Sequence, residues 1–236
     1  MDHLERIVFM KKNSTILIYL LFFVSSSLFA DLISVSDNLP LIFSTVRLEI
    51  DSNTQPAQII DPPTSVVNYY PDIETMLGFN EKQNVNLLTP LKVDGNTLID
   101  SGTVVSSHII FLTIAKEKGS YLYHPDVQWE FDNTILGVMS DAYGSLIFQS
   151  NPILGAEGTE YYGSDLLTST YGLERTDLYS IDDNILSTSL VTVRSGLGDW
   201  MRVITLGDIN AIPEPTTLLL LFFCLPLLTL TKKKNR

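Results

Sequence analysis

One stretch near the middle of the chain decides its fold class: Asp126-Val127-Gln128-Trp129-Glu130-Phe131-Asp132. Apolar side chains at Val127, Trp129 and Phe131 alternate there with polar ones. A period of two residues is that of a β-strand with one face in a core and the other in water. The stretch therefore predicts a half-buried strand.

Further strand signals lie on both sides of this stretch. Residues 104–115 form a long apolar run, expected to be a strand that is buried in part on both faces. Residues 186–193 alternate again, and residues 200–206 close the series. We expect a loop with at most one helical turn over residues 69–80, and a short apolar segment among the strands at 146–148. Turn signals about every 8–12 residues and the absence of long helical periodicity predict an all-β fold, an antiparallel β-sandwich of jelly-roll-like or immunoglobulin-like type.

The composition of the chain changes when its two ends are set aside. Residues 31–210 of the 236 are expected to be one extracellular domain with a sizeable core. They hold 8 of the 15 Lys and Arg residues and 24 of the 27 Asp and Glu residues, a formal net charge of −16. This acidity argues against nucleic-acid binding, which needs a basic surface. The only cysteine, Cys224, lies outside this region, so neither a disulfide nor a thiol nucleophile is expected within it.

Residues 1–30 have the order of a secretory signal peptide. Lys11 and Lys12 precede an apolar stretch over residues 16–24, and small residues then lead to Ala30. This order predicts export of the chain, with signal peptidase cleaving after Ala30.

Residues 212–236 combine three features in a fixed order. Pro213 and Pro215 flank Glu214, and each proline favours an extended backbone at its own position and at the preceding residue. The apolar run over residues 216–231 predicts a single transmembrane helix of about 16 residues, short of the roughly 20 that cross hydrocarbon comfortably. The basic tail, residues 232–236, carries its charges at Lys232, Lys233, Lys234 and Arg236. Such a tail favours a cytoplasmic C-terminus and acts as a stop-transfer signal. Because the helix is short, we expect the anchor to be transient.

This order resembles the PEP-CTERM sorting signal of Gram-negative bacteria, in which a Pro-Glu-Pro triplet precedes a short transmembrane helix and a basic end. The resemblance implies that the chain is a substrate of exosortase, a membrane enzyme that cuts near the triplet and releases or transfers the protein. One departure is Pro226 within the helix, although transmembrane helices tolerate proline. The alternative is an ordinary C-terminal membrane anchor.

Residues 101–206 carry a second resemblance, to a recurrent domain of PEP-CTERM proteins that has no assigned activity. Such domains show an LGV strand, a GLE-x-x-D segment and a closing D-x-x-RVIT strand. The matching segments are Leu136-Gly137-Val138, Gly172-Leu173-Glu174-Arg175-Thr176-Asp177 and Asp199-Trp200-Met201-Arg202-Val203-Ile204-Thr205. The resemblance implies a β-domain and an extracellular compartment, but no reaction.

Two groups of charged residues are candidate sites. Glu174 and Asp177 are candidate partners of Arg202 in a buried ion pair, which would explain why their two segments occur together. Asp182 and Asp183 lie in a predicted turn and offer oxygen ligands to a structural Ca²⁺. The alternative for these two residues is an ordinary role as turn formers.

Aromatic residues form a third candidate site, a platform on which a sugar ring could pack: Tyr161, Tyr162, Tyr171 and Trp200. Most of them belong to a long loop over residues 155–172, and loops on a rigid scaffold commonly carry binding sites. The alternative is that they are the usual strand and rim residues of a β-protein. His108 is expected to be a packed or edge histidine in an apolar strand, and His124 to be exposed in a turn.

No nucleophile elbow, metal-ligand spacing or catalytic triad can be selected from the sequence. We therefore expect a protein that is not an enzyme and needs no cofactor beyond the candidate Ca²⁺. It is expected to pass through the inner membrane and to reach the cell surface or the extracellular matrix, with a structural or adhesive role beside exopolysaccharide. The alternatives are a glycan-binding module and a secreted carbohydrate-active enzyme, which would need two carboxylates about 5–10 Å apart.

Overall fold

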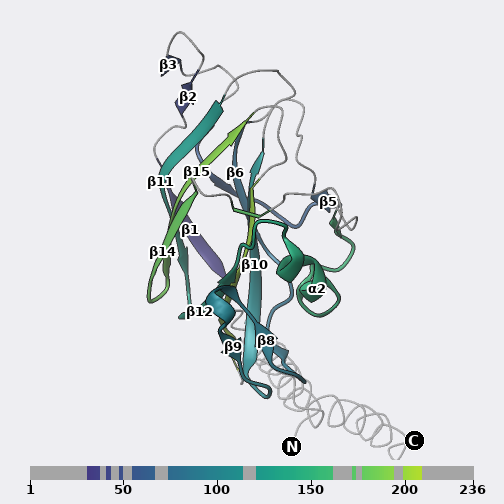
Figure 1. Ribbon diagram of the computed structural model, residues 1–236. Helices are drawn as coiled ribbons and strands as arrows, with labels where there is room; N and C mark the ends of the chain where they lie inside the picture. The colour runs from purple at the N-terminus through teal and green to yellow at the C-terminus, as the bar shows by residue number, and fades with distance from the viewer. Residues whose placement is uncertain are drawn as a thin grey trace, which may run out of the picture. The chain divides into compact units, whose positions relative to one another are not determined.

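Two β-sheets dominate the computed structural model of the chain, which confirms the all-β prediction (Figure 1). The structure describes residues 31–37, 41–43, 48–49, 55–66, 74–113, 121–161, 172–173, 177–193 and 199–208. These residues lie within one compact unit bounded by Ala30 and Ile212. The predicted signal peptide and sorting segment, residues 1–30 and 212–236, fall outside the described residues. Within the described part of the chain, no helix has the length and apolar character to span a membrane.

Sheet 1 is antiparallel and has the strand order β14-β15-β11-β2-β3, with β1 also paired to β11. Its strands are β1 (Leu32–Ser36), β2 (Leu41–Phe43), β3 (Leu48–Glu49), β11 (Tyr121–Phe131), β14 (Leu178–Asp182) and β15 (Ile185–Val193). On β11, Val127, Trp129 and Phe131 are buried, whereas Gln128 and Glu130 are exposed. The half-buried strand that the sequence predicts there is confirmed.

Sheet 2 has the strand order β12-β16-β10-β6-β4, with β7 also paired to β10. Its strands are β4 (Gln58–Ile59), β6 (Thr75–Asn80), β7 (Val85–Asn86), β10 (Val104–Thr113), β12 (Ile135–Met139) and β16 (Trp200–Leu206). Only β4 and β6 pair in parallel among these described strands. β10 is buried along its whole length, as expected. β6 corrects the loop expected over residues 69–80, since a strand buried on both faces shows no alternation of apolar and polar residues.

Sheet 2 has a core on each of its faces. One core lies against sheet 1 and joins Trp129, Phe131 and Leu186 to Ile110, Met201 and Val203. The other lies on the opposite face and joins Phe79, Phe111, Trp200 and Ile204 to Ile147 and Leu154 of the helix α2 (Ser145–Leu154). Figure 1 shows α2 and β11 on opposite sides of β10. Gly78 permits the close approach of the sheets, because a Cβ there would lie 2.6 Å from Cζ3 of Trp129.

The helix α2 corrects the sequence-based expectation for residues 146–148. Its sequence contains Ser, Asn and Pro, which are weak helix formers, so its ten residues carry little helical signal. The Asp141 carboxylate supplies the missing start signal: it accepts hydrogen bonds from the N–H groups of Ser145 (2.8 Å) and Leu146 (2.9 Å). A carboxylate at this end also interacts favourably with the helix dipole.

Short elements complete the described fold. β5 (Ser65–Val66) and β13 (Glu160–Tyr161) pair in parallel, while β8 (Leu91–Lys92) and β9 (Leu98–Ile99) form a hairpin. The hairpin turn contains the 3-10 helix η1 (Asp94–Asn96), in which Gly95 adopts a left-handed φ of 69°.

Candidate functional site

Arg202 of β16 is fully buried and forms an ion pair on the face of sheet 2 that carries α2. Its Nε donates to Oε2 of Glu81 at 2.6 Å, and its Nη2 donates to Oε1 at 2.7 Å. The buried pair predicted for Arg202 is therefore present, but its partner is Glu81 and not the predicted Asp177. The carboxylate of Asp177 accepts the N–H of Val191 instead (2.8 Å), and Glu174 lies outside the described residues.

The same guanidinium group holds α2 in place. Nη1 donates to the carbonyl oxygen of Ile147 (2.7 Å) and to Oγ of Ser150 (2.6 Å), and Nη2 donates to Oδ1 of Asn151 (2.7 Å). A buried charge is tolerated only when it is paired and its donors are bonded, and Arg202 meets both conditions.

Two hydroxyl groups complete the cluster around Glu81. Tyr161 donates to Oε1 of Glu81 at 2.5 Å and accepts the N–H of Ala156, while Ser107 donates to Oε2 at 2.6 Å. Burial, and next the charge of Glu81, raise the pKa of the Tyr161 hydroxyl above its ordinary value. We call Glu81, Ser107, Tyr161 and Arg202 the charged network.

These contacts correct the predicted aromatic platform. Trp200 is fully buried and packs on Phe111 and Phe148, with ring centroids 6.4 and 6.2 Å apart. Tyr161 has its hydroxyl engaged in the charged network. Trp200 therefore cannot contribute to a sugar-binding surface, and Tyr161, which is half-buried, has a structural role in the network. Tyr162 and Tyr171 lie outside the described residues.

The opposite face of sheet 2 carries an uncharged cluster around His108. Nδ1 of His108 lies 2.8 Å from Oδ1 of Asn80, and Nε2 lies 3.0 Å from Oγ1 of Thr205. Since the amide oxygen accepts, Nδ1 carries the proton and Nε2 accepts from Thr205. Burial lowers the pKa of His108 to about 3, so the ring is neutral. The packed histidine is confirmed, and we call these three residues the neutral network.

His124 corrects a second expectation, because it is buried and not exposed. The pairing of β11 with β15 is irregular between His124 and Val127, and Asp126 has a φ of 52°. A β-bulge of this kind redirects the side chains next to it. Nδ1 of His124 lies 3.4 Å from Oδ2 of Asp37.

The predicted turn is confirmed between β14 and β15, where Asp183 and Asn184 form it and Asp182 is the last residue of β14. Asp183 adopts a φ of 51°, and its Oδ1 accepts the hydroxyl of Thr134 at 2.9 Å. No group of three or more His, Cys, Asp or Glu side chains suited to a metal occurs within the described ranges. The Ca²⁺ site stays a prediction, whereas the turn role has direct support.

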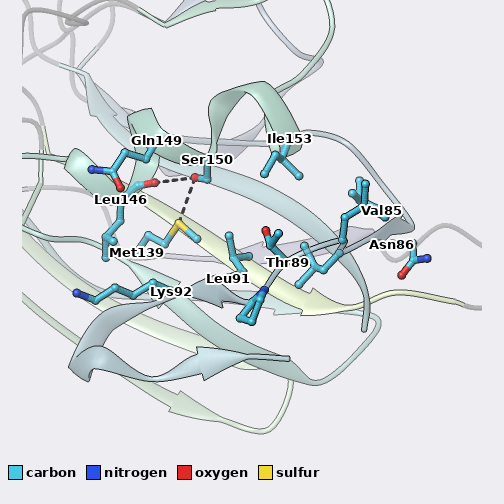
Figure 2. A pocket seen from close by; sticks show the side chains of 13 residues that line it. Val85, Asn86, Thr89, Leu91, Lys92, Met139, Leu146, Gln149, Ser150 and Ile153 are labelled. Atoms are coloured by element: carbon cyan, nitrogen blue, oxygen red, sulfur yellow. Dashed lines mark hydrogen bonds between the residues drawn. The ribbon is translucent and has the colours of Figure 1, made fainter. Parts of the chain in front are cut away.

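A groove of about 420 Å³ lies between α2 and the chain that runs from β7 to β8. Figure 2 shows Leu146, Ser150 and Ile153 of α2 facing Leu91 and its neighbours, with Met139 between them. Most of the lining is apolar, and the one charged side chain that lines it is Lys92. Sequence reasoning misses the groove, although the leucine-rich segment that ends at Pro90 was an available signal.

Ser150 connects the groove to the charged network. Its Oγ accepts from Arg202, donates to the carbonyl oxygen of Leu146 (2.7 Å) and lies 3.3 Å from Sδ of Met139 (Figure 2). Leu146 and Met139 both line the groove. The charged network therefore positions one wall of the groove.

Comparison with protein-family models, curated proteins and solved structures found no match. The resemblance of residues 212–236 to a PEP-CTERM sorting signal, and that of residues 101–206 to a domain of such proteins, stay predictions.

Proposed function

We propose that this protein is an exported, non-enzymatic component of the bacterial cell surface or extracellular matrix. The observation that carries the proposal is the order of Pro213-Glu214-Pro215, an apolar run and a basic end, together with an N-terminal signal peptide. Exosortase and signal peptidase are the processing partners, and the inner membrane holds the chain before the C-terminal cut.

The role of the delivered domain is structural or adhesive, beside exopolysaccharide. A rigid scaffold is supported by the buried polar groups of sheet 2, which bond to one another: Glu81 to Arg202, and Asn80 to His108. The glycan-binding alternative loses support, because Trp200 is buried and Tyr161 is bonded to Glu81.

The finer fold belongs to the same proposal: a β-sandwich closer to the jelly-roll type than to the immunoglobulin type. Its support is the path of the chain, since the connections β10–β11, β11–β12, β12–β14 and β15–β16 each pass from one sheet to the other. Repeated crossing between two packed sheets is typical of jelly rolls. An experimental structure would decide the type.

Mass spectrometry of the mature C-terminus tests the sorting step. The full chain is expressed in a host with exosortase and in a matched host without it. We expect a terminus near Pro215 in the first host and Arg236 in the second. A chain that still ends at Arg236 in both hosts would show an ordinary anchor. As a control, Pro226→Leu lies outside the triplet and should leave the cut unchanged.

A further inference from the structure

The groove beside α2 has the size and lining of a ligand site. Its volume of about 420 Å³ falls within the range of small-molecule pockets, roughly 300–1,000 Å³. Leu88 is 88 % exposed and Ile153 is 42 % exposed, and both line it. Large apolar side chains that are open to water around a concave surface mark a place where an apolar ligand gains free energy by displacing water.

The charge at the groove narrows the class of ligand. The described residues contain three cationic side chains, Lys82, Lys92 and Arg202. Arg202 is buried and paired with Glu81, and Nζ of Lys82 donates to the carbonyl oxygen of Pro152. Lys92 has no hydrogen bond or ion pair with another described residue, and it lines the groove. In Figure 2, Lys92 and Gln149 lie toward one end of the groove, and Val85 and Asn86 toward the other.

We propose that this groove binds the hydrocarbon chain of an anionic amphiphile, with the head group at Lys92. Leu91, Met139, Leu146 and Ile153 offer apolar contacts for the chain. Lys92 supplies a cation where the rest of the exported region is strongly acidic, so an anionic head group is attracted to this end and repelled elsewhere. Gln149 adds an amide donor at the same end.

Photo-crosslinking with a dodecanoate that carries a diazirine on its chain tests the proposal. The full chain is held in amphipol, irradiated with the probe and mapped by mass spectrometry. We expect crosslinks on residues 85–92 and 146–153, and unlabelled dodecanoate should compete with them. Crosslinks confined to residues 216–231, or spread evenly over the chain, would overturn the proposal.

Matched variants distinguish apolar contacts within the groove from non-specific hydrophobic binding to the protein surface. Leu88→Asp should lower the groove crosslinks several-fold, whereas Leu98→Asp, which changes a 58 % exposed leucine outside the groove, should not. Each methylene added to the ligand chain should tighten binding about fourfold until the groove is full. Equal effects of the two leucine variants, or no dependence on chain length, would contradict a groove site.

The head group is tested by charge. Lys92→Gln should weaken dodecanoate binding about threefold and leave dodecanol unchanged, since an exposed ion pair has a modest effect. Lys82→Gln is the matched control and should change neither. Loss of dodecanol binding in Lys92→Gln would show that the ammonium group has no head-group role. These outcomes do not depend on processing near Pro215, so the groove and the sorting proposal can fail separately.

Discussion

The two faces of sheet 2 solve the burial of polar groups in different ways. Adjacent residues contribute to both faces. Asn80, at the end of β6, and His108 of β10 point toward sheet 1, whereas Glu81, directly after β6, and Ser107 of β10 point toward α2. The first face holds the neutral network within a core shared by two sheets. The second holds the charged network beneath a helix and loops.

The difference reflects what packs on each face. Where one sheet packs on another, the backbone N–H and C=O groups of both sheets are already paired within the sheets. The polar groups left to satisfy on this face are side chains, and the two ring nitrogens of His108 are bonded to the neutral side chains of Asn80 and Thr205. A helix brings unpaired carbonyl groups near its C-terminal end. Lys82 supplies a donor there, because its Nζ bonds to the carbonyl oxygen of Pro152, and Arg202 bonds to the carbonyl oxygen of Ile147 in the first turn of the helix. The charged network is thus found on the face of sheet 2 that a helix and loops cover, and the neutral network on the face that sheet 1 covers.

Each face of sheet 2 contains one buried tryptophan, whose fluorescence can report on the packing of that face alone. Trp129 belongs to the core between the sheets and Trp200 to the core under α2. Trp200→Phe leaves a reporter of the first face, and Trp129→Phe leaves a reporter of the second. The four predictions below use urea unfolding of these single-tryptophan chains.

The largest effect is expected from Glu81→Gln. The change leaves the buried guanidinium of Arg202 without its counter-charge, which should lower the free energy of unfolding by about 3–5 kcal/mol. The Trp200 reporter should respond first. Glu130→Gln, on an exposed hydrogen bond to Ser34, is the control and should change it by less than about 0.5 kcal/mol. If Glu81→Gln and Glu130→Gln had equal effects, the charged network would have no special role in the stability of the face that carries α2.

The second-largest effect is expected from acid, which should lower the free energy of unfolding through the neutral network. The pKa of His108 is lowered to about 3 from its ordinary 6.5, so between these pH values the unfolded chain binds the extra proton. The contribution of neutral His108 to the free energy of unfolding is fully present above about pH 6.5. It falls as the pH is lowered, by about 3 kcal/mol at pH 4. His108→Gln should flatten the difference between pH 7 and pH 4. An unchanged pH dependence in this variant would contradict the assignment of the acid sensitivity to His108.

Gly78→Ala should act on the face between the sheets. The added methyl group would meet the ring of Trp129, and overpacking of this kind costs about 1–3 kcal/mol. The Trp129 reporter should shift its emission, while the Trp200 reporter should follow only the global loss. Gly158→Ala, where nothing lies within 4 Å but φ is 80°, separates the effect of packing from that of backbone strain.

The smallest effect is expected from Asp141→Ala. It removes the carboxylate that caps α2, which should lower the free energy of unfolding by about 0.5–2 kcal/mol. Local opening should be visible as faster amide exchange at Ser145 and Leu146. The exposed Glu157, replaced by Ala, is the control. Uniform exchange in both variants would mean that the cap has no local role.

The sequence predicts strands that alternate, such as β11 and β15, and strands that form a long apolar run, such as β10. β11 and β15 are read correctly because water on one side imposes alternation. β6 is missed, because both of its faces are buried, so that it shows no alternation, and its six residues, which include Thr75, Gly78 and Asn80, are too short and mixed to form an apolar run. The charged network has the same difficulty: Arg202 can be expected to need an acid, but Glu81 is 121 residues away, and only the register of β6, β10 and β16 brings the two together.

The position of β16 also has a consequence for the order in which the protein folds. β16 lies between β12 and β10 in sheet 2, yet it is the last described strand of the chain. Neither face of the sheet can therefore close until residue 206 has been delivered, and contacts between residues distant in sequence form slowly. On the proposed export route, the chain would therefore cross the membrane before sheet 2 has formed. Only a few residues separate the end of β16 from Pro213, so the proposed C-terminal cut and the completion of sheet 2 would depend on delivery of nearly the same part of the chain.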